Sequence, residues 1–175
     1  TLDEPNETFN ISLAVVSNAG TGDLLAIGTI TDNDGAPNLY LSDLAISEGD
    51  AGAMIASLAS ISGLEVEFDV QSFATGSAVG GGTDYNNLAS TRFTIPVGQL
   101  TVGFSLTTVE DTTYEGNESF DVSFSNITNA GNGDSQGVVT IQEDDAQPVL
   151  AIYDATDNEG ATLGFVVSLS VASDV

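Results

Sequence analysis

The residues that could do chemistry in this sequence are carboxylates, and they gather in two short stretches. Residues 110–118 hold four of them, and residues 143–145 (EDD) hold three more. Clustered carboxylates repel one another unless a cation lies between them, and the chain has one Arg, no Lys and no His. The missing partner is most simply calcium, because Ca²⁺ accepts about 6–8 oxygen ligands in flexible geometry.

Both acidic stretches occur again elsewhere in the chain. Residues 4–9 (EPNETF) match 115–120 (EGNESF), and residues 30–34 (ITDND) match 141–145 (IQEDD), both at an offset of 111 (115 − 4 and 141 − 30). The same offset relates residues 47–49 (SEG) to 158–160 (NEG). We therefore predict tandem modules: 1–34 is the C-terminal part of one, 35–145 is a complete module, and 146–175 is the N-terminal part of a third.

Apolar and polar residues alternate in many short segments. Leu64, Val66, Phe68 and Val70 face one side of a predicted strand, with acids between them. Further strands are predicted over 8–16, 38–46 and 53–61, and residues 129–134 read as a Gly- and Asn-rich hairpin loop. About seven short strands separated by turns, without helical periodicity, predict an all-β fold, an antiparallel sandwich.

Five motifs, in this order, resemble the Calx-beta family: S-E-G at 47–49, D-Y at 84–85, the acidic pair at 110–111, E-x-x-E-x-F at 115–120, and the acidic cluster at 143–145. The resemblance implies an immunoglobulin-like antiparallel β-sandwich in tandem repeats, with calcium sites near the exit of each module. The matching positions are Glu48, Asp84, Glu110, Asp111, Glu115, Glu143, Asp144 and Asp145. Strand ends gather at the two poles of a sandwich, so we expect these eight carboxylates to share a pole.

At some positions the role of calcium ligand follows less directly from the family pattern. Glu118 is either a further ligand or a residue that supports the site, and Glu110 and Glu143 stand where the family more often has Asp. The partial modules keep four of the matching acids but cannot complete a site by themselves. These acids are Glu4, Asp32, Asp34 and Glu159.

The net charge of −25 bears on the partners of the chain. Nucleic-acid binding requires basic side chains that displace counterions, so it is disfavoured, and so is direct binding to anionic membranes. An enzyme is not expected, because His, Cys and Lys are all absent. A pair of carboxylates could serve a glycosidase, but clustered carboxylates would sooner bind metal.

The leading interpretation is a segment of an extracellular, calcium-stiffened array that serves adhesion or spacing at a cell surface. Its partners would be neighbouring modules, and a cell-surface ligand or other copies of the chain. One alternative is a subunit of an extracellular filament or matrix, with strands pairing between chains. Another is a calcium-sensing regulatory domain of an exchanger-type membrane protein, although the lack of Lys argues against a cytosolic setting.

Overall fold

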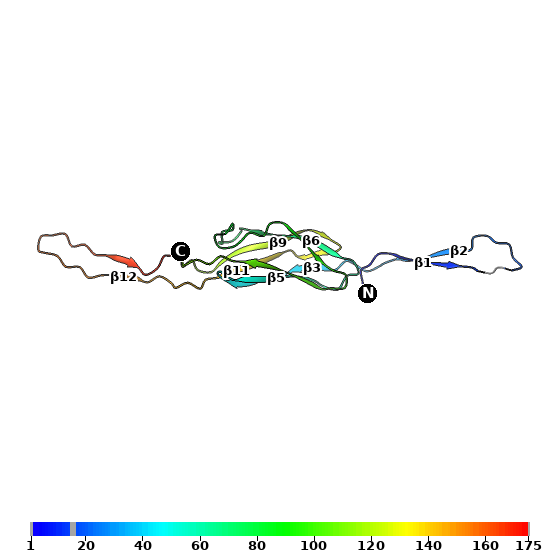
Figure 1. Ribbon diagram of the computed structural model, residues 1–175, viewed down its shortest axis with the longest axis horizontal. Coiled ribbons are helices and arrows are strands. Elements are labelled where there is room, and N and C mark those ends of the chain that lie inside the picture. The colour runs from blue at the N-terminus through cyan, green and yellow to red at the C-terminus, as the bar shows by residue number, and fades with distance from the viewer. Residues whose placement is uncertain (1, 15–16, 175) are drawn as a thin grey trace.

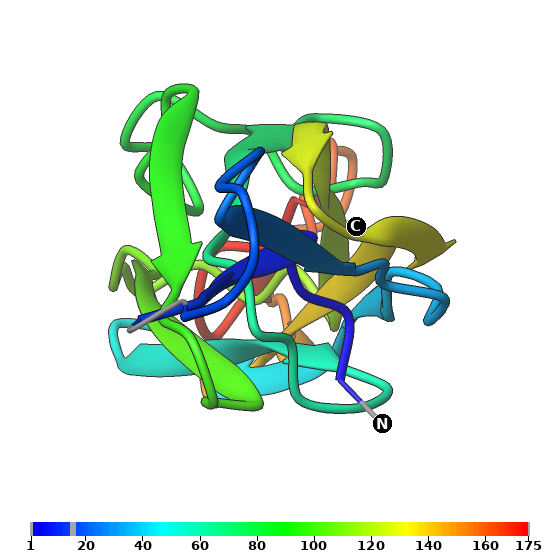
Figure 2. The same ribbon diagram turned by 90° about the vertical axis from the view of Figure 1, so that its right-hand side faces the viewer.

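The computed structural model describes residues 2–14 and 17–174 of the chain, and these form an elongated, all-β molecule. A central sandwich occupies the middle of the long axis, and one two-stranded hairpin projects from each end (Figure 1). An end-on view shows the N-terminal hairpin in front of the two layers of the sandwich (Figure 2). Among the described residues we find no helix suited to crossing a membrane.

The sandwich consists of a four-stranded and a five-stranded sheet. The first has the order β10 (Gly131–Asp134), β3 (Asn38–Leu41), β5 (Ala51–Leu58), β8 (Thr101–Thr107). The second has the order β4 (Leu44–Ser47), β11 (Gln136–Gln142), β9 (Glu118–Thr128), β6 (Val66–Phe73), β7 (Thr91–Ile95). The predicted immunoglobulin-like sandwich is confirmed, but the pairs β10–β3 and β11–β4 are parallel.

Strand β6 shows why the two sheets pack face to face. Val66, Phe68 and Val70 are fully buried, as their alternation predicts. The acids between them point outward, where Glu67 and Asp69 both bind the guanidinium of Arg92, at 3.1 and 2.7 Å. These outer carboxylates therefore form an ion-pair group far from the acidic strand ends.

Two details of the predicted strands were wrong. The segment 38–46 is not one strand: it crosses from β3 in one sheet to β4 in the other at Ser42 and Asp43. Their side chains accept hydrogen bonds from the backbone N–H groups of Ile55 (3.0 Å) and Val138 (2.8 Å). Strand β10 lies within the predicted hairpin loop. Together with the division of 38–46 into two strands, it gives residues 35–145, all of which the structure describes, nine strands where about seven are predicted.

The hairpins at the two ends repeat strand pairs of the sandwich. In the N-terminal hairpin, β1 (Glu7–Ser12) pairs with β2 (Leu25–Ile30) in the register that β9 and β11 show 111 residues later. In the C-terminal hairpin, β12 (Leu150–Ile152) pairs with β13 (Val167–Leu169) in the register of β3 and β5. The predicted strand 8–16 is thus β1, and residues 15–16 of that prediction lie outside the described residues.

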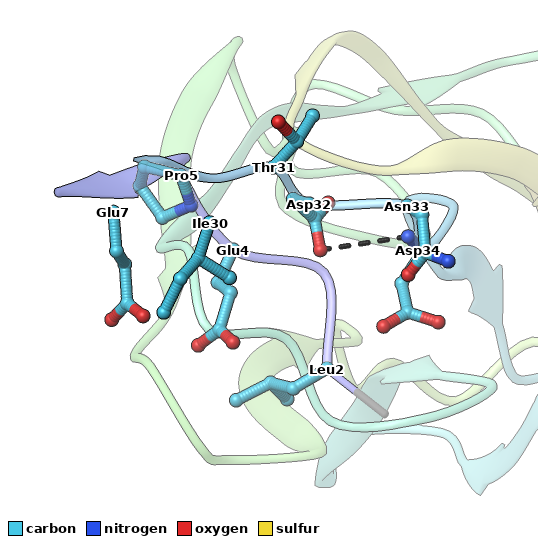
Figure 3. A pocket seen from close by; sticks show the side chains of 9 residues that line it. All are labelled: Leu2, Glu4, Pro5, Glu7, Ile30, Thr31, Asp32, Asn33 and Asp34. Carbon is cyan, nitrogen blue, oxygen red and sulfur yellow. Dashed lines mark hydrogen bonds between the residues drawn. The ribbon is translucent and has the colours of Figure 1, made fainter. Parts of the chain in front are cut away.

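The turn of the N-terminal hairpin also follows the repeat. Asn18 and Asn129 both have a φ of 60°, a left-handed conformation that Asn tolerates better than most residues. A pocket at the base of the hairpin is lined by residues that include Glu4, Asp32 and Asp34 (Figure 3).

Phe120 and Phe9 occupy matching places in the repeat, which allows a direct test of the fold. Phe120 is 1% exposed in the sandwich core, whereas Phe9 is 50% exposed on the hairpin. We expect Phe120→Ala to lower the free energy of unfolding by about 3–5 kcal/mol, because it leaves a cavity. Phe9→Ala should leave it almost unchanged, as measured by urea denaturation of the dilute protein. Similar losses in both variants would contradict this description of the core.

Candidate metal centre

Four separate chain segments meet at one pole of the sandwich because of the parallel pair β4–β11. Parallel strands end at the same edge, and the last residue pair is Ser47 with Gln142. Glu48 and Glu143 follow directly, and the backbone N–H of Glu48 donates to the carbonyl of Gln142 at 3.1 Å. The loop between β6 and β7 and the loop between β8 and β9 complete the pole.

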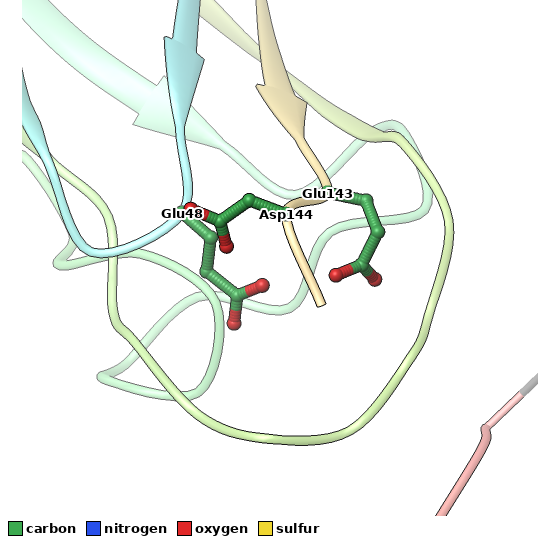
Figure 4. Close-up of side chains that lie close together, drawn as sticks. All are labelled: Glu48, Glu143 and Asp144. Carbon is green, nitrogen blue, oxygen red and sulfur yellow. The ribbon is translucent and has the colours of Figure 1, made fainter. Parts of the chain in front are cut away.

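Three groups of carboxylates at this pole could each hold a metal ion. In every group, one oxygen of each side chain lies within 4.8 Å of the others. The groups are Glu48 with Glu143 and Asp144, Glu48 with Asp111 and Glu115, and Asp84 with Glu115 and Glu118. Glu48 and Glu115 each belong to two groups, so their carboxylates could bridge neighbouring ions, and Figure 4 shows the first group at the ends of β4 and β11.

Glu48 is held in place by a buried hydroxyl. The side chain of Thr108, which is 7% exposed, donates to the carbonyl of Ser47 (2.9 Å) or that of Asp50 (3.1 Å). The backbone N–H of Thr108 donates to the carbonyl of Asp50 as well, at 3.0 Å. This residue at the end of β8 therefore fixes the turn that presents Glu48.

Asp84 is positioned by the aromatic residue that follows it. Tyr85 is 1% exposed and stacks on Phe120, with ring centroids 3.7 Å apart and planes at 5°. Asp84 itself is 8% exposed, and its carboxylate accepts a hydrogen bond from the backbone N–H of Val79 at 2.5 Å. The D-Y motif thus combines a core anchor with a carboxylate at the edge of the pole.

Glu143 is both a candidate ligand and a brace for the acidic loops. One carboxylate oxygen accepts from the backbone N–H groups of Glu115 (2.6 Å) and Gly116 (2.9 Å), and the other accepts from that of Asp145 (2.7 Å). Burial of Glu143 raises its pKa, but these backbone donors outweigh that effect and the net pKa is lowered. Glu143 therefore stays ionised and ties the β8–β9 loop to the exit of the module.

Gly49 allows Glu110 to approach the pole. Gly49 has a φ of 72°, and a Cβ atom placed there would lie 2.9 Å from the Cβ of Glu110. A side chain at position 49 would thus be strained and would push Glu110 away. Glu110 belongs to none of the three groups, but the charge of Asp144, followed by burial, raises its pKa.

Four further carboxylates of the pole have raised pKa values, so they resist ionisation. Burial, followed by the charge of Asp111, raises the pKa of Glu48 to about 7, and burial with a hydrogen bond to Asp84 raises that of Glu118 to about 7. Burial and nearby acids also raise the pKa values of Glu115 and Asp145. One buried oxygen of Asp145 has no hydrogen-bond partner among the described residues, so it can accept a further donor or a cation.

The structure divides the twelve predicted ligands into two sets. Six of the eight from the complete module belong to the three groups. The other two, Glu110 and Asp145, lie close enough to these groups that the charges of Asp111 and Asp144 raise their pKa values. The four acids from the partial modules lie elsewhere and belong to none of the groups found among the described residues. Glu4, Asp32 and Asp34 surround the pocket at the opposite end of the sandwich, and Glu159 is exposed in the turn of the C-terminal hairpin.

A hydrogen bond of the acidic segment after β11 recurs in the matching segment after β2, which we call the N-terminal junction. The N–H of Asp32 donates to the side chain of Asn6 at 2.8 Å, as that of Glu143 does to Asn117 at 3.1 Å. The acids at the N-terminal junction thus keep the loop conformation of the pole.

Two acids near the pole were missed by the sequence analysis. Asp50 adds to the repulsion that raises the pKa of Glu110, and Asp174 adds to that acting on Glu115. The position of Asp50 directly after the S-E-G motif is a signal that could have indicated it. Asp174 follows β13 of the C-terminal hairpin, and only the folded chain brings it near.

No protein-family model matches this sequence, and no curated protein sequence matches it. Solved structures do match the fold. The crystal structure of CBD12 from CALX1.2 aligns with a TM-score of 0.58 and 17% identity, covering 67% of this chain and 48% of that one. The calcium binding domain CBD12 of CALX1.1 aligns with a TM-score of 0.52 and 19% identity, over 67% and 50%. The apo-form Calx CBD1 domain aligns with a TM-score of 0.53 and 15% identity, over 62% and 98%.

These matches place the protein among chains with the sandwich fold of the Calx CBD domains. They agree with the resemblance to the Calx-beta family that the five sequence motifs carry. The aligned part spans about half the length of the CBD12 structures and almost all of the CBD1 domain, so the likeness is that of a single module.

The raised pKa values predict that the metal-free protein becomes less stable to unfolding as the pH rises. Glu48 and Glu118 titrate near 7 in the folded state, against an ordinary value of 4.5. Folding therefore favours their protonated forms, and this stability is full below about pH 4.5 and is lost as the pH rises through about 7. We expect the Tm in the presence of a chelator to fall between about pH 5 and about pH 8.

Glu48→Gln is the control for this experiment, because the amide cannot ionise and the variant should show a smaller fall. Thermal melts followed by circular dichroism measure both proteins. A wild-type Tm that stays level or rises over this range would contradict the assigned pKa directions.

Proposed function

We propose that this chain is a calcium-binding structural segment of a longer extracellular protein, in which calcium at the pole of each module stiffens the connection to the next. The observation that carries the proposal is a set of three linked groups of carboxylates at one pole, which together draw on four chain segments. Within each group the ligand oxygens lie within 4.8 Å of one another. Oxygen donors from carboxylates suit Ca²⁺ better than softer metals. Glu48, Asp84, Asp111, Glu115 and Asp144 would hold the ions, with Glu143 and Glu118 beside them.

Contacts between modules support the stiffening role. At the pole, the backbone N–H of Asp174 donates to the carbonyl of Tyr114 at 3.1 Å, so the next module touches the loop that presents Glu115. At the other end of the sandwich, the N–H of Gly63 donates to the carbonyl of Asp3 at 2.8 Å, which is the same contact 111 residues earlier. An ion held by this loop would therefore order the junction as well as the module.

The charge of the chain supports an extracellular setting and a role in adhesion or spacing. A net charge of −25 with one basic residue fits a calcium-rich environment, where bound cations offset the repulsion. A calcium-sensing regulatory domain of an exchanger-type protein is the second candidate, and the fold likeness to the Calx domains is the observation that favours it. We prefer the extracellular array because of the repeat. No catalytic role is proposed for the carboxylates.

Calcium should stabilise the central module strongly. A ligand that binds only the folded state adds about 2.7 kcal/mol at a concentration of 100 times its Kd. In a domain of this size, that corresponds to a rise in Tm of about 10 °C or more. Asp144→Asn should lose much of this rise, because one carboxylate of the first group is removed, while the metal-free Tm should stay equal or increase as repulsion is relieved.

Asp134→Asn is the matched control, since Asp134 lies on β10 outside the three groups and uses one carboxylate oxygen to accept from the N–H of Gln136. This variant should keep the full response to calcium. A Tm that is indifferent to calcium, or equal responses in the two variants, would show that the acids of the pole are only a solvated surface.

Calcium should also restrict bending at the junctions. With the pole saturated, the hairpins should keep the extended arrangement along the long axis, and chelation should broaden the range of shapes. Small-angle X-ray scattering of the 175-residue protein measures this through the maximum dimension and the flexibility of the particle. The stiffening role would be refuted by identical scattering with calcium and with a chelator.

A further inference from the structure

Strand β8 forms one edge of the four-stranded sheet, and among the described residues no other strand pairs with its outer side. It differs from the other three edge strands of the sandwich in length and charge. Strand β8 has seven residues (TVGFSLT) without a charged side chain, whereas β7 has five and carries Arg92, and β4 and β10 have four each. Natural sheets protect their edges with short strands, charges or Pro, so a long uncharged edge marks a pairing site.

The backbone of β8 has free hydrogen-bonding groups on this edge. The N–H of Leu58 donates to the carbonyl of Leu100 at 2.8 Å, so the even-numbered residues of β8 direct their backbone groups toward β5. The odd-numbered residues direct theirs outward, and at the end of the strand the carbonyl of Thr107 accepts from the N–H of Asn86 at 3.1 Å. Before that contact, the N–H and carbonyl groups of residues 101, 103 and 105 point to the open edge.

Small side chains leave this edge accessible. Thr101, Gly103 and Ser105 are all exposed. A Cβ atom placed on Gly103 would have only atoms of Ile55 and Met54, both on β5, within 4 Å. A further strand could therefore approach β8 without a side chain in its way.

The distribution of charge favours a second copy of the chain at this edge. The net charge is −25, but residues 85–109, which include β7 and β8, are the longest stretch without Asp or Glu. The two strands lie together, with the rings of Phe93 and Phe104 5.0 Å apart between centroids, and they are the green strands on the left of Figure 2. Within the four described strands of the β8 sheet, Asp134 is the only acid, and it lies on β10 at the opposite edge. Two copies therefore meet with the least repulsion through β8.

We infer that β8 of one copy pairs antiparallel with β8 of a second copy, so that their four-stranded sheets join into one continuous sheet. The register that uses the whole free edge places a two-fold axis at Gly103 and sets Thr101 opposite Ser105 of the other copy. The same strand supplies donors and acceptors to both sides, so the contact is self-complementary and closes as a dimer.

Antiparallel pairing also keeps the acidic poles of the two copies apart. Thr107, which leads to the pole, lies four residues from the axis (107 − 103) in each copy. The two Thr107 residues are thus about 27 Å apart, at about 3.4 Å per residue. This separation is several times the screening length of about 8 Å at 0.15 M salt, whereas parallel pairing would place the poles side by side. The contact uses no carboxylate of the pole, so its failure would leave the proposed function intact.

Engineered cysteines test the contact and its register, because the chain has no Cys of its own. Gly103→Cys places two thiols opposite each other in a hydrogen-bonded pair, where the Cα atoms are about 5.5 Å apart, a distance that a disulfide spans. Under mild oxidation this variant should form a covalent dimer, seen by non-reducing gel electrophoresis. Thr101→Cys is the matched control: it should stay monomeric alone and form a covalent dimer when it is mixed with Ser105→Cys.

Sedimentation equilibrium at high salt, with a chelator present, measures the reversible contact. Wild type should show a monomer–dimer equilibrium. Ser105→Pro removes an outward N–H but leaves the ladder to β5 intact, so it should raise the dissociation constant about tenfold or more. Ser105→Ala keeps the N–H and should associate as wild type does. All these proteins carry the same terminal hairpins, so differences between them report on β8 alone.

Three results would overturn the pairing of β8 with β8. The first is a wild type that stays monomeric at all concentrations. The second is a folded Ser105→Pro variant, checked by circular dichroism, that dimerises as wild type does. The third is a Thr101→Cys variant that forms covalent dimers alone as readily as Gly103→Cys, which would show a different register or random collision.

Discussion

Repulsion among carboxylates at one pole of the sandwich is the interaction on which the rest of this account depends. The pole gathers acids from four chain segments, and the chain's single cationic side chain, Arg92, is bound to Glu67 and Asp69 on the outer face of β6. Folding must therefore either keep some of these carboxyls protonated or bring in a cation. The pKa values of about 7 for Glu48 and Glu118 show the first solution, and bound calcium would provide the second.

The architecture of the sandwich creates this pole. The chain crosses between sheets at Ser42 and Asp43, and this crossing makes β4 run parallel to β11, so that Glu48 and Glu143 leave their strands together. The core then fixes the remaining acids: Thr108 holds the turn around Glu48, and Tyr85 anchors Asp84. Packing and backbone pairing thus bring these acids together, and the carboxylate of Glu143 adds to this by tying the β8–β9 loop to the end of β11.

Much of this arrangement could be predicted from the sequence, because the signals are local. Alternation of Val66, Phe68 and Val70 predicts a strand with one buried face, and the offset of 111 predicts matching elements. The register of the terminal hairpins agrees with that offset pair by pair. Six of the eight acids expected at the pole form groups that could hold metal.

Other features depend on contacts between distant segments and could not be read from the sequence. The crossing at Ser42 and Asp43 depends on hydrogen bonds with β5 and β11, and β10 becomes a strand only because β3 lies beside it. Asp174 approaches Glu115 through the backbone hydrogen bond that its N–H donates to the carbonyl of Tyr114. The bracing role of Glu143 likewise arises from backbone donors that only the folded loops bring to it.

The central claim is that calcium relieves the strain of ionising this pole, and proton release on binding tests it most directly. Calcium would displace the protons held by Glu48 and Glu118, which are partly protonated at about pH 6.5 because of their raised pKa values. Isothermal titration calorimetry at that pH, in buffers with different heats of ionisation, measures the protons released. We expect saturable calcium binding with a heat that depends on the buffer. Absence of saturable binding, or a heat that is the same in every buffer, would contradict it.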